Sequence, residues 1–235
     1  MKKSLLVEAC SLALAACSAA AAEDLSALVD KIANAYGGRA ALENFTALRE
    51  TGRVKPAAST GGSVPTVRTY ARPLKLRVEI GEASKPGEVR VVDGEKGWRN
   101  GQESTGMGYE AMVLQAVRLD LPFQLLSQLK TLVEKEPMDY QGKRLRVVEL
   151  PLEHGLSIKA GIEPQTGRIL FTAGTTKSGP AGPMTFETRY DDFQTVEGRL
   201  FAFKETNFAG GMKTAEIVLT KVELLNAPPA DAFKP

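Results

Sequence analysis

An unbroken alternation of apolar and charged residues restricts the fold of this chain more than any other feature of its sequence. In the segment Leu74–Ile80, every second residue is apolar and every residue between them is charged. Successive side chains of a β-strand point to opposite faces, so the segment predicts a strand with one buried and one hydrated face. Such strands are typical of antiparallel sheets that cover a core on one side.

Similar segments recur along most of the chain and are separated by turn dipeptides such as Asp93-Gly94 and Thr166-Gly167. About a dozen strands in one domain predict a large curved sheet or an open barrel, because a flat sheet of that size would leave its apolar face uncovered. The predicted strands cover residues 48–54, 66–71, 74–80, 89–92, 97–100, 131–136, 144–150, 156–162, 169–173, 185–190, 200–208 and 215–224.

Helical segments accompany these strands. The segment Leu25 to Tyr36 places apolar residues on one helical face, and Gly37-Gly38 after it form a helix stop that tolerates positive φ. A shorter helical run covers residues 39–45. Two more helices, at residues 109–119 and 122–129, interrupt the strand order, and we expect them to plug the open side of the sheet. A plug that contains Met, Phe and Leu can also move aside to admit an acyl chain.

The first 22 residues have the composition of an export signal. Lys2 and Lys3 precede an apolar stretch at residues 5–16, and Ala20-Ala21-Ala22 supplies the small residues that a signal peptidase requires. The apolar stretch is too short to remain in a bilayer as a spanning helix. We therefore expect residues 1–22 to be removed and residues 23–235 to form a single domain.

A second cleavage site competes with the first. The tetrapeptide Leu14-Ala15-Ala16-Cys17 fits a bacterial lipobox, in which the cysteine is lipidated and becomes the mature N-terminus after residues 1–16 are removed. The sequence leaves both sites open. Beyond Cys17 the chain has no cysteine, so the stability of the domain must come from its core and its hydrogen bonds.

Charge and composition exclude several classes of function. The 30 Lys and Arg residues nearly balance the 28 Asp and Glu residues, and a net charge of +2 gives no electrostatic case for a nucleic-acid partner. One histidine and two cysteines cannot assemble a Cys/His zinc site. His154 stands beside Gly155 and is expected at a turn, and the sequence contains no nucleophile elbow or phosphate-binding loop. We expect no enzymatic activity, no metal and no cofactor.

Several motifs together resemble one bacterial family. Tyr70–Arg77, with Arg72-Pro73 at its centre, is followed about twenty residues later by Val92–Trp98, and this strand pair resembles that of the lipoprotein-sorting (LolA-like) family. Residues 34–42, 190–203 and 227–234 are similar to an uncharacterised, sorting-like branch of that family. The resemblance spans nearly the whole predicted mature chain.

The resemblance implies an unclosed antiparallel half-barrel of about eleven strands, mainly β, with helices that cover a hydrophobic cavity. Members of the family carry acyl chains of lipoproteins across the periplasm of Gram-negative bacteria, or receive them at the outer membrane, without a cofactor. In the family an arginine before proline holds the lid helices, and Arg72 is the matching position. The family's tryptophan at the sheet edge matches Trp98.

These motifs lead to a specific hypothesis. The expected function is the binding or transport of a lipid, or of the acyl chains of a lipoprotein, in the periplasm, with an outer-membrane anchor if Cys17 is lipidated. The alternative is an envelope sensor or scaffold that uses the same half-barrel to bind a protein partner. The residues expected to line the cavity are Leu74, Leu76, Val78, Ile80, Trp98, Met112, Val113, Phe123 and Leu126.

Overall fold

The computed structural model describes residues 25–82, 84–177 and 182–235. The expected export signal, both expected cleavage sites and Cys17 lie outside the described residues. Within the described ranges, no helix is long and apolar enough to cross a membrane.

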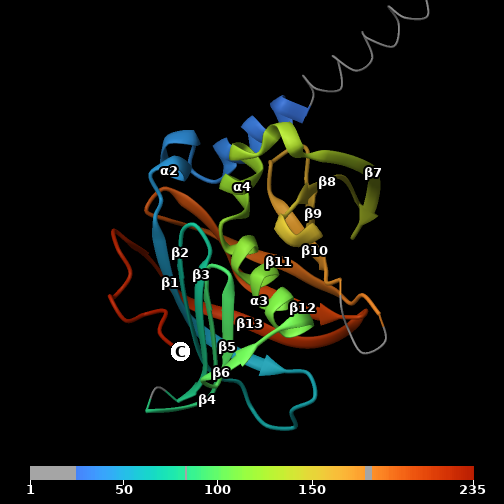
Figure 1. The fold of residues 1–235 in the computed structure, drawn as a ribbon. Coiled ribbons are helices and arrows are strands. Elements are labelled where there is room, and N and C mark those ends of the chain that lie inside the picture. Colours follow the sequence, from blue (N-terminus) through green and yellow to red (C-terminus); the bar gives the residue numbers. More distant parts are fainter. Residues whose placement is uncertain (1–24, 83, 178–181) are drawn as a thin grey trace, which may run out of the picture.

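The described residues form thirteen strands in one antiparallel sheet that is not closed into a barrel (Figure 1). The predicted fold class is therefore confirmed. One further strand, β6, was not predicted because its three residues are too few to show an alternation. The strands are β1 (Ala47–Pro56), β2 (Val64–Ala71), β3 (Lys75–Glu82), β4 (Lys85–Asp93), β5 (Lys96–Arg99), β6 (Gln102–Ser104), β7 (Val133–Tyr140), β8 (Lys143–Pro151), β9 (Ser157–Ile162), β10 (Ile169–Thr175), β11 (Thr185–Val196), β12 (Arg199–Ala209) and β13 (Met212–Leu225).

The sheet consists of two meanders joined where the first strand pairs with the last. Its strand order is β6-β5-β4-β3-β2-β1-β13-β12-β11-β10-β9-β8-β7, so β1 and β13 meet in the middle and β6 and β7 form the two edges. The β1–β13 pairing is irregular at Gly52, where a Cβ atom would stand 2.4 Å from the backbone oxygen of Val218. Only glycine permits this close approach.

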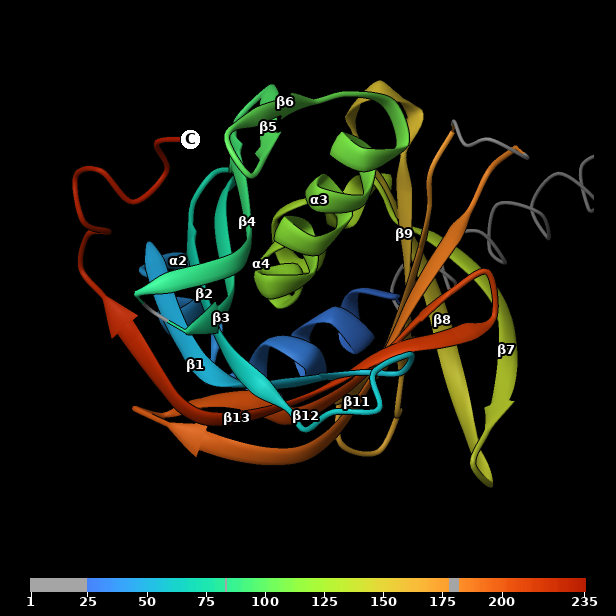
Figure 2. The same cartoon turned by 90° about the horizontal axis from the view of Figure 1, so that it is seen from below.

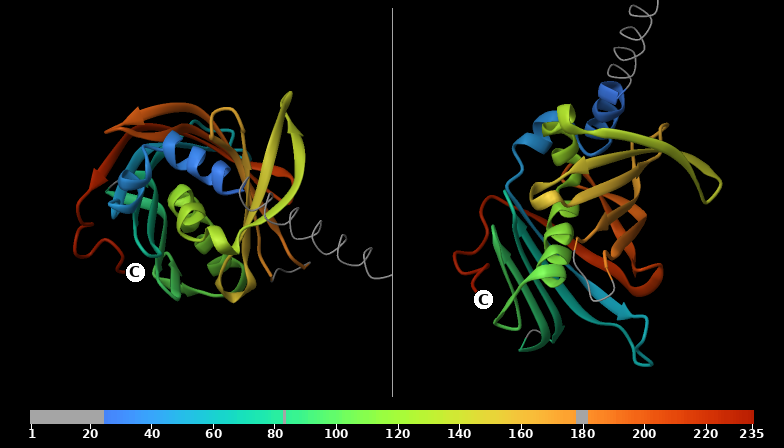
Figure 3. Two further views of the ribbon diagram at one scale, coloured as in Figure 1. Left: turned by 90° about the horizontal axis from the view of Figure 1, so that it is seen from above. Right: turned by 45° about the vertical axis from the view of Figure 1, so that its right-hand side comes forward.

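The helices lie on the concave side of the sheet, where they were expected. Because β6 and β7 follow each other in the sequence but occupy opposite edges, the chain between them has to cross the open side. That crossing consists of α3 (Gly106–Leu119) and α4 (Leu121–Ser127). The opening helix, residues 25–35, and α2 (Arg39–Glu43) lie near α4, and the sheet curves around them (Figures 2 and 3).

The helix α3 is apolar on two sides because it packs between the two halves of the sheet. Met112 and Ala116 join a buried cluster with Tyr70 and Leu76, which belong to the β1–β6 half. Val113, Leu114 and Val117 join a second cluster with Val148, Leu150, Ile158 and other residues of the β7–β13 half, together with the opening helix and α4. The helix therefore holds the two halves at a fixed separation.

Candidate ligand-binding site

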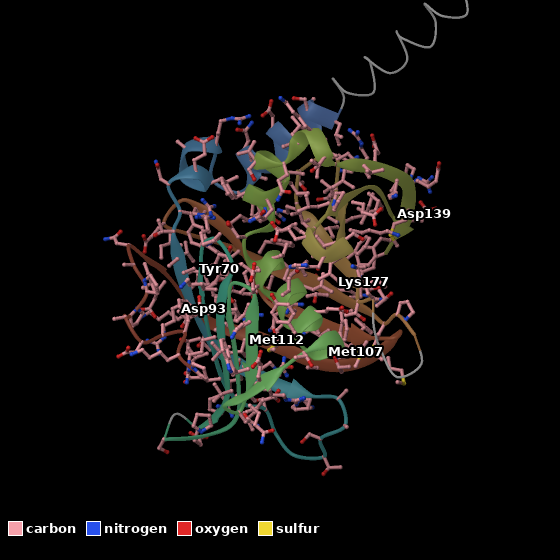
Figure 4. The ribbon with its side chains drawn as sticks, viewed as in Figure 1. Tyr70, Asp93, Met107, Met112, Asp139 and Lys177 are labelled. Atoms are coloured by element: carbon pink, nitrogen blue, oxygen red, sulfur yellow. The ribbon has the colours of Figure 1, made fainter. Side chains whose placement is uncertain are left out.

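A cavity of about 510 Å³ lies between α3 and the concave face of the sheet. We call it the main cavity. Its walls come from both halves of the sheet, and Met107 and Met112 of α3, labelled in Figure 4, form part of its helical side. Its apolar lining residues are Val54, Pro56, Val78, Ile80, Met107, Ala111, Met112, Leu114, Ile158, Phe186, Phe208, Ala209, Ala215 and Ile217.

The main cavity has an open and a closed end. The lining residues Pro56, Arg99, Gly108 and Thr214 are exposed, which places the mouth beside the N-terminal end of α3. At the other end, Arg68, Thr172 and Thr188 are only 1–2% exposed, and Arg118 of α3 lies beside them. From Met107 to Arg118 the helix rises by about 16 Å, at about 1.5 Å per residue. The cavity is thus a long pocket with a mainly apolar middle and a polar inner end. Glu88, Arg90 and Gln115 also line it, and Arg90 lies 2.6 Å from Glu88.

A group of buried charged residues closes the inner end. Arg68 of β2 donates two hydrogen bonds of 2.7 Å to Glu205 of β12, and its Nε lies 2.7 Å from Glu50 of β1. Arg118 approaches Glu205 at 3.5 Å and donates hydrogen bonds to Thr188 and Asn207. We call Glu50, Arg68, Arg118 and Glu205 the buried ion cluster. Because the sheet curls, the cluster joins β1 and β2 to β12, although β13 lies between β1 and β12 in the sheet.

The two glutamates of this cluster differ in how easily they lose a proton. Burial raises the pKa of Glu50, and the nearby charge of Arg68 only partly opposes this effect. Burial acts on Glu205 as well, but the charges of Arg68 and Arg118 outweigh it and lower the pKa of that carboxyl. Glu205 is therefore the carboxylate that balances Arg68, whereas Glu50 takes up a proton more readily than an exposed glutamate.

A second cavity, of about 70 Å³, lies on the other side of the buried ion cluster. Arg118 and Thr172 line both cavities, so the cluster forms the partition between them. The second cavity is also lined by Arg199, which is 7% exposed and whose Nε and Nη1 have no hydrogen-bond acceptor among the described residues. The guanidinium of Arg199 lies 4.1 Å from the ring centroid of Phe45, and burial lowers its pKa to about 10.

Arg72 connects the sheet to the helices at the end of the molecule opposite the mouth. Its guanidinium donates hydrogen bonds of 2.5 and 2.9 Å to Asp120, the residue between α3 and α4. It also donates to the backbone oxygens of Leu42 and Glu43 in α2, at 2.7 and 3.2 Å. The same guanidinium lies 3.5 Å from the ring centroid of Phe123 in α4. One side chain thus contacts both α2 and α4.

The structure separates the residues expected to line the cavity into distinct groups. Val78, Ile80 and Met112 line the main cavity. Leu76, Val113 and Leu126 lie in the packed core clusters instead, because α3 and α4 press directly against the sheet above the cavity. Leu74 is partly buried against both clusters, and Phe123 is partly buried beside Arg72.

The placement of Trp98 is corrected by the structure. The residue before it, Gly97, faces α3, where a Cβ atom would stand 2.8 Å from the terminal methyl of Met112. Adjacent residues of a strand face opposite sides, so Trp98 points away from the cavity. It packs on the outer side of the sheet with Val91 and with Phe233 of the C-terminal segment.

Sequence reasoning missed the residues that form the inner end of the main cavity. Glu50, Arg68 and Glu205 occupy strand positions that point to the apolar, concave face, and this interruption of the apolar pattern was the available signal. Their meeting depends on the pairing of β1 with β13, which the sequence did not reveal. His154 lies in a short turn, with φ of 55°, as expected. No group of three metal-ligating side chains occurs among the described residues.

Comparisons with known proteins support the fold. No family model and no curated protein sequence matches the chain. Its structure is similar to that of a putative outer membrane lipoprotein-sorting protein domain from Vibrio parahaemolyticus, with a TM-score of 0.57 at 9% identity, covering 91% of this chain and 97% of that one. It is also similar to a LolA superfamily protein from Nitrosomonas europaea, with a TM-score of 0.54 at 11% identity, covering 88% and 96%. The expected LolA-like resemblance is confirmed at the level of the fold.

The two glutamates of the buried ion cluster should respond very differently to substitution. Glu205→Gln leaves the buried Arg68 without its main counter-charge, and we expect a loss of about 3–5 kcal/mol in the free energy of unfolding. Glu50→Gln removes the carboxyl that burial already disfavours, and we expect a loss below about 1 kcal/mol. Urea unfolding at pH 7 measures both values.

The pH dependence provides the control. Because the pKa of Glu50 is raised, the folded state holds this proton more tightly than the unfolded state. The free energy of unfolding should therefore fall as the pH rises above the ordinary glutamate range, and Glu50→Gln should remove that fall. Equal losses for the two variants would contradict the assignment of Glu205 as the balancing carboxylate.

Proposed function

We propose that this protein binds a long acyl chain in the main cavity and acts as a carrier or acceptor of lipids, or of lipoprotein acyl chains, in the bacterial envelope. The observation that supports the proposal is the main cavity itself. Its volume of about 510 Å³ lies within the range of small-molecule sites, and its middle is lined by aliphatic, methionine and phenylalanine side chains. We propose no catalytic step for this site.

The free energy available from such a cavity is sufficient for stable binding. Each methylene transferred from water into an apolar site contributes about 0.8 kcal/mol, so burying about ten contributes about 8 kcal/mol before the entropic cost of association. The methionines Met107 and Met112 add adaptability, because their unbranched side chains repack around ligands of different shape.

The similar structures give this proposal its cellular context. One is described as a putative outer membrane lipoprotein-sorting protein domain and the other as a LolA superfamily protein. A periplasmic location would agree with the export signal expected at residues 1–22. The alternative is a protein partner. Binding such a partner would require a broad, exposed apolar patch on the surface. The large apolar side chains that are exposed in the described residues are distributed over β2, β7 and β13, which favours the enclosed ligand.

We further propose that Arg72 holds α2 and α4 against the sheet. Arginine is suited to this position because its fixed fork of donors binds a carboxylate and two backbone oxygens at once. Asp120 is nearly fully buried, with 1% of its surface exposed, so its charge depends on Arg72. This contact closes the end of the molecule opposite the mouth of the main cavity.

Filling the cavity should abolish acyl-chain binding. Ala111 lies on the side of α3 that lines the main cavity, and Ala111→Trp places an indole inside it. We expect at least a tenfold loss of affinity for a fluorescent fatty-acid probe, measured by titration with the delipidated protein. Met212→Trp, at a position that is 74% exposed outside the cavity, is the matched control. An affinity that Ala111→Trp leaves unchanged would contradict the assignment of this cavity.

Loss of Arg72 should loosen the helices rather than the whole sheet. Arg72→Met removes the ion-pair partner of the buried Asp120 carboxylate. We expect the rate of hydrogen–deuterium exchange to rise, relative to the wild type, more in α2 and α4 than in β1 and β13. Arg72→Lys should rescue the effect only in part, because an ammonium cannot reproduce the fork. An equal rise in exchange rate in the helices and the sheet would show that Arg72 has no specific role in holding the helices.

Anchoring through Cys17 is a separate proposal. We propose that cleavage before Cys17 produces a lipidated protein, so that metabolic labelling with a palmitate analogue marks the wild type and not Cys17→Ala. The labelled protein should fractionate with membranes, because more than one acyl chain gives stable attachment. Unlabelled wild-type protein in the soluble periplasmic fraction would instead establish cleavage after Ala22.

A further inference from the structure

The inner end of the main cavity has a composition that an acyl chain alone does not explain. A cavity for hydrocarbon gains nothing from charged residues at its closed end, because burying unpaired polar groups is costly. Yet Arg118, Thr172, Thr188 and Asn207 all line this end. A ligand that fills the cavity therefore brings its deepest atoms against an arginine and several neutral polar groups.

Arg118 retains the capacity to bind an acceptor. Its Nη1 is occupied by Thr188 and Asn207, but its contact with Glu205 is long, at 3.5 Å, and its Nε has no hydrogen-bond partner among the described residues. Glu205 has a stronger partner in Arg68, at 2.7 Å. A small rotation of the Arg118 guanidinium would offer Nε and Nη2 together, which is the edge that grips a carboxylate with two parallel hydrogen bonds.

The charge balance at the partition also favours an anion. Arg68 and Arg118 face Glu50 and Glu205 there, so the four charges of the buried ion cluster cancel only while both glutamates are ionised. Burial raises the pKa of Glu50, and its protonation leaves one positive charge in surplus. An anion beside Arg118 would reduce the cost of this uncompensated charge.

We propose that the main cavity binds a single-chain amphiphile with an anionic head, such as a fatty acid, head first, with the head group against Arg118. The apolar middle of the cavity then encloses the chain, and the methyl end points toward the mouth near Met107. This inference rests on the proposed function and narrows it. An acyl chain of a lipoprotein is attached to a polypeptide at its head, so it would have to enter with its methyl end first.

Two probes of equal chain length separate head recognition from chain burial. Calorimetric titration of the delipidated protein at pH 8 compares dodecanoate, which carries an anionic head, with 1-dodecanol, which carries a neutral one. We expect dodecanoate to bind at least about tenfold more tightly, because hydrogen bonds to a charged group are worth more than neutral ones. In Arg118→Met this preference should fall to a ratio near one.

Control variants identify the position of the head. Arg53→Met removes an exposed positive charge outside both cavities and should keep the preference for dodecanoate. Arg99→Met removes an arginine at the mouth, so a preference that disappears in Arg99→Met and persists in Arg118→Met would overturn the head-first orientation. Equal binding of the two probes by the wild type would overturn the inference and leave the proposed function standing. Binding of neither probe would overturn both.

The wild type supplies an independent measurement that does not depend on the folding of any variant. A soluble gadolinium chelate broadens the carboxyl resonance of [1-¹³C]dodecanoate if the head is exposed at the mouth and spares it if the head is buried beside Arg118. We expect the bound resonance to stay sharp. Broadening equal to that of the free ligand would contradict the proposal.

Discussion

The bidentate contact between Arg68 and Glu205 ties the two halves of the sheet together at its concave side. It joins β2 to β12 across the two strands between them, and this is possible only because the sheet curls until its concave side chains converge. Both residues are nearly fully buried, so removing either side chain would leave an uncompensated charge in the interior. The pair therefore fixes the curvature of the sheet at the position where α3 ends.

That curvature determines where the molecule is packed and where it is hollow. Beyond the buried ion cluster, toward α2 and α4, the opening helix, α4 and the end of α3 fill the concave side with Leu, Ile and Val side chains. On the other side of the cluster, α3 covers the concave face, and its side chains from Met107 to Arg118 leave a space between the helix and the sheet. The main cavity is the space that results. A partition of charged residues gives it a polar end, and this polarity distinguishes it from a simple hydrocarbon groove.

The sequence predicted the elements of this fold far better than the site. Alternation in Leu74–Ile80 and in the later strands identified the sheet, and the helical spacing after Tyr109 identified α3, because both patterns are local. The expected orientation of Trp98 was wrong. In a strand of four residues the pattern does not show which face meets α3, and the helix approaches so closely that Gly97, which has no Cβ atom, occupies that face. The buried ion cluster was not foreseen, because its members come from β1, β2, β12 and α3 and meet only through tertiary structure.

In the arrangement proposed above, the main cavity holds a single acyl chain with its head at the buried ion cluster. A crystal structure of the protein with 12-bromododecanoate tests it most directly, because the anomalous signal of bromine marks the far end of the chain. We expect one bromine site inside the main cavity, near Met107 at the mouth, and a carboxylate within hydrogen-bond distance of Arg118. Bromine beside Arg118, or no bromine within the cavity, would contradict it.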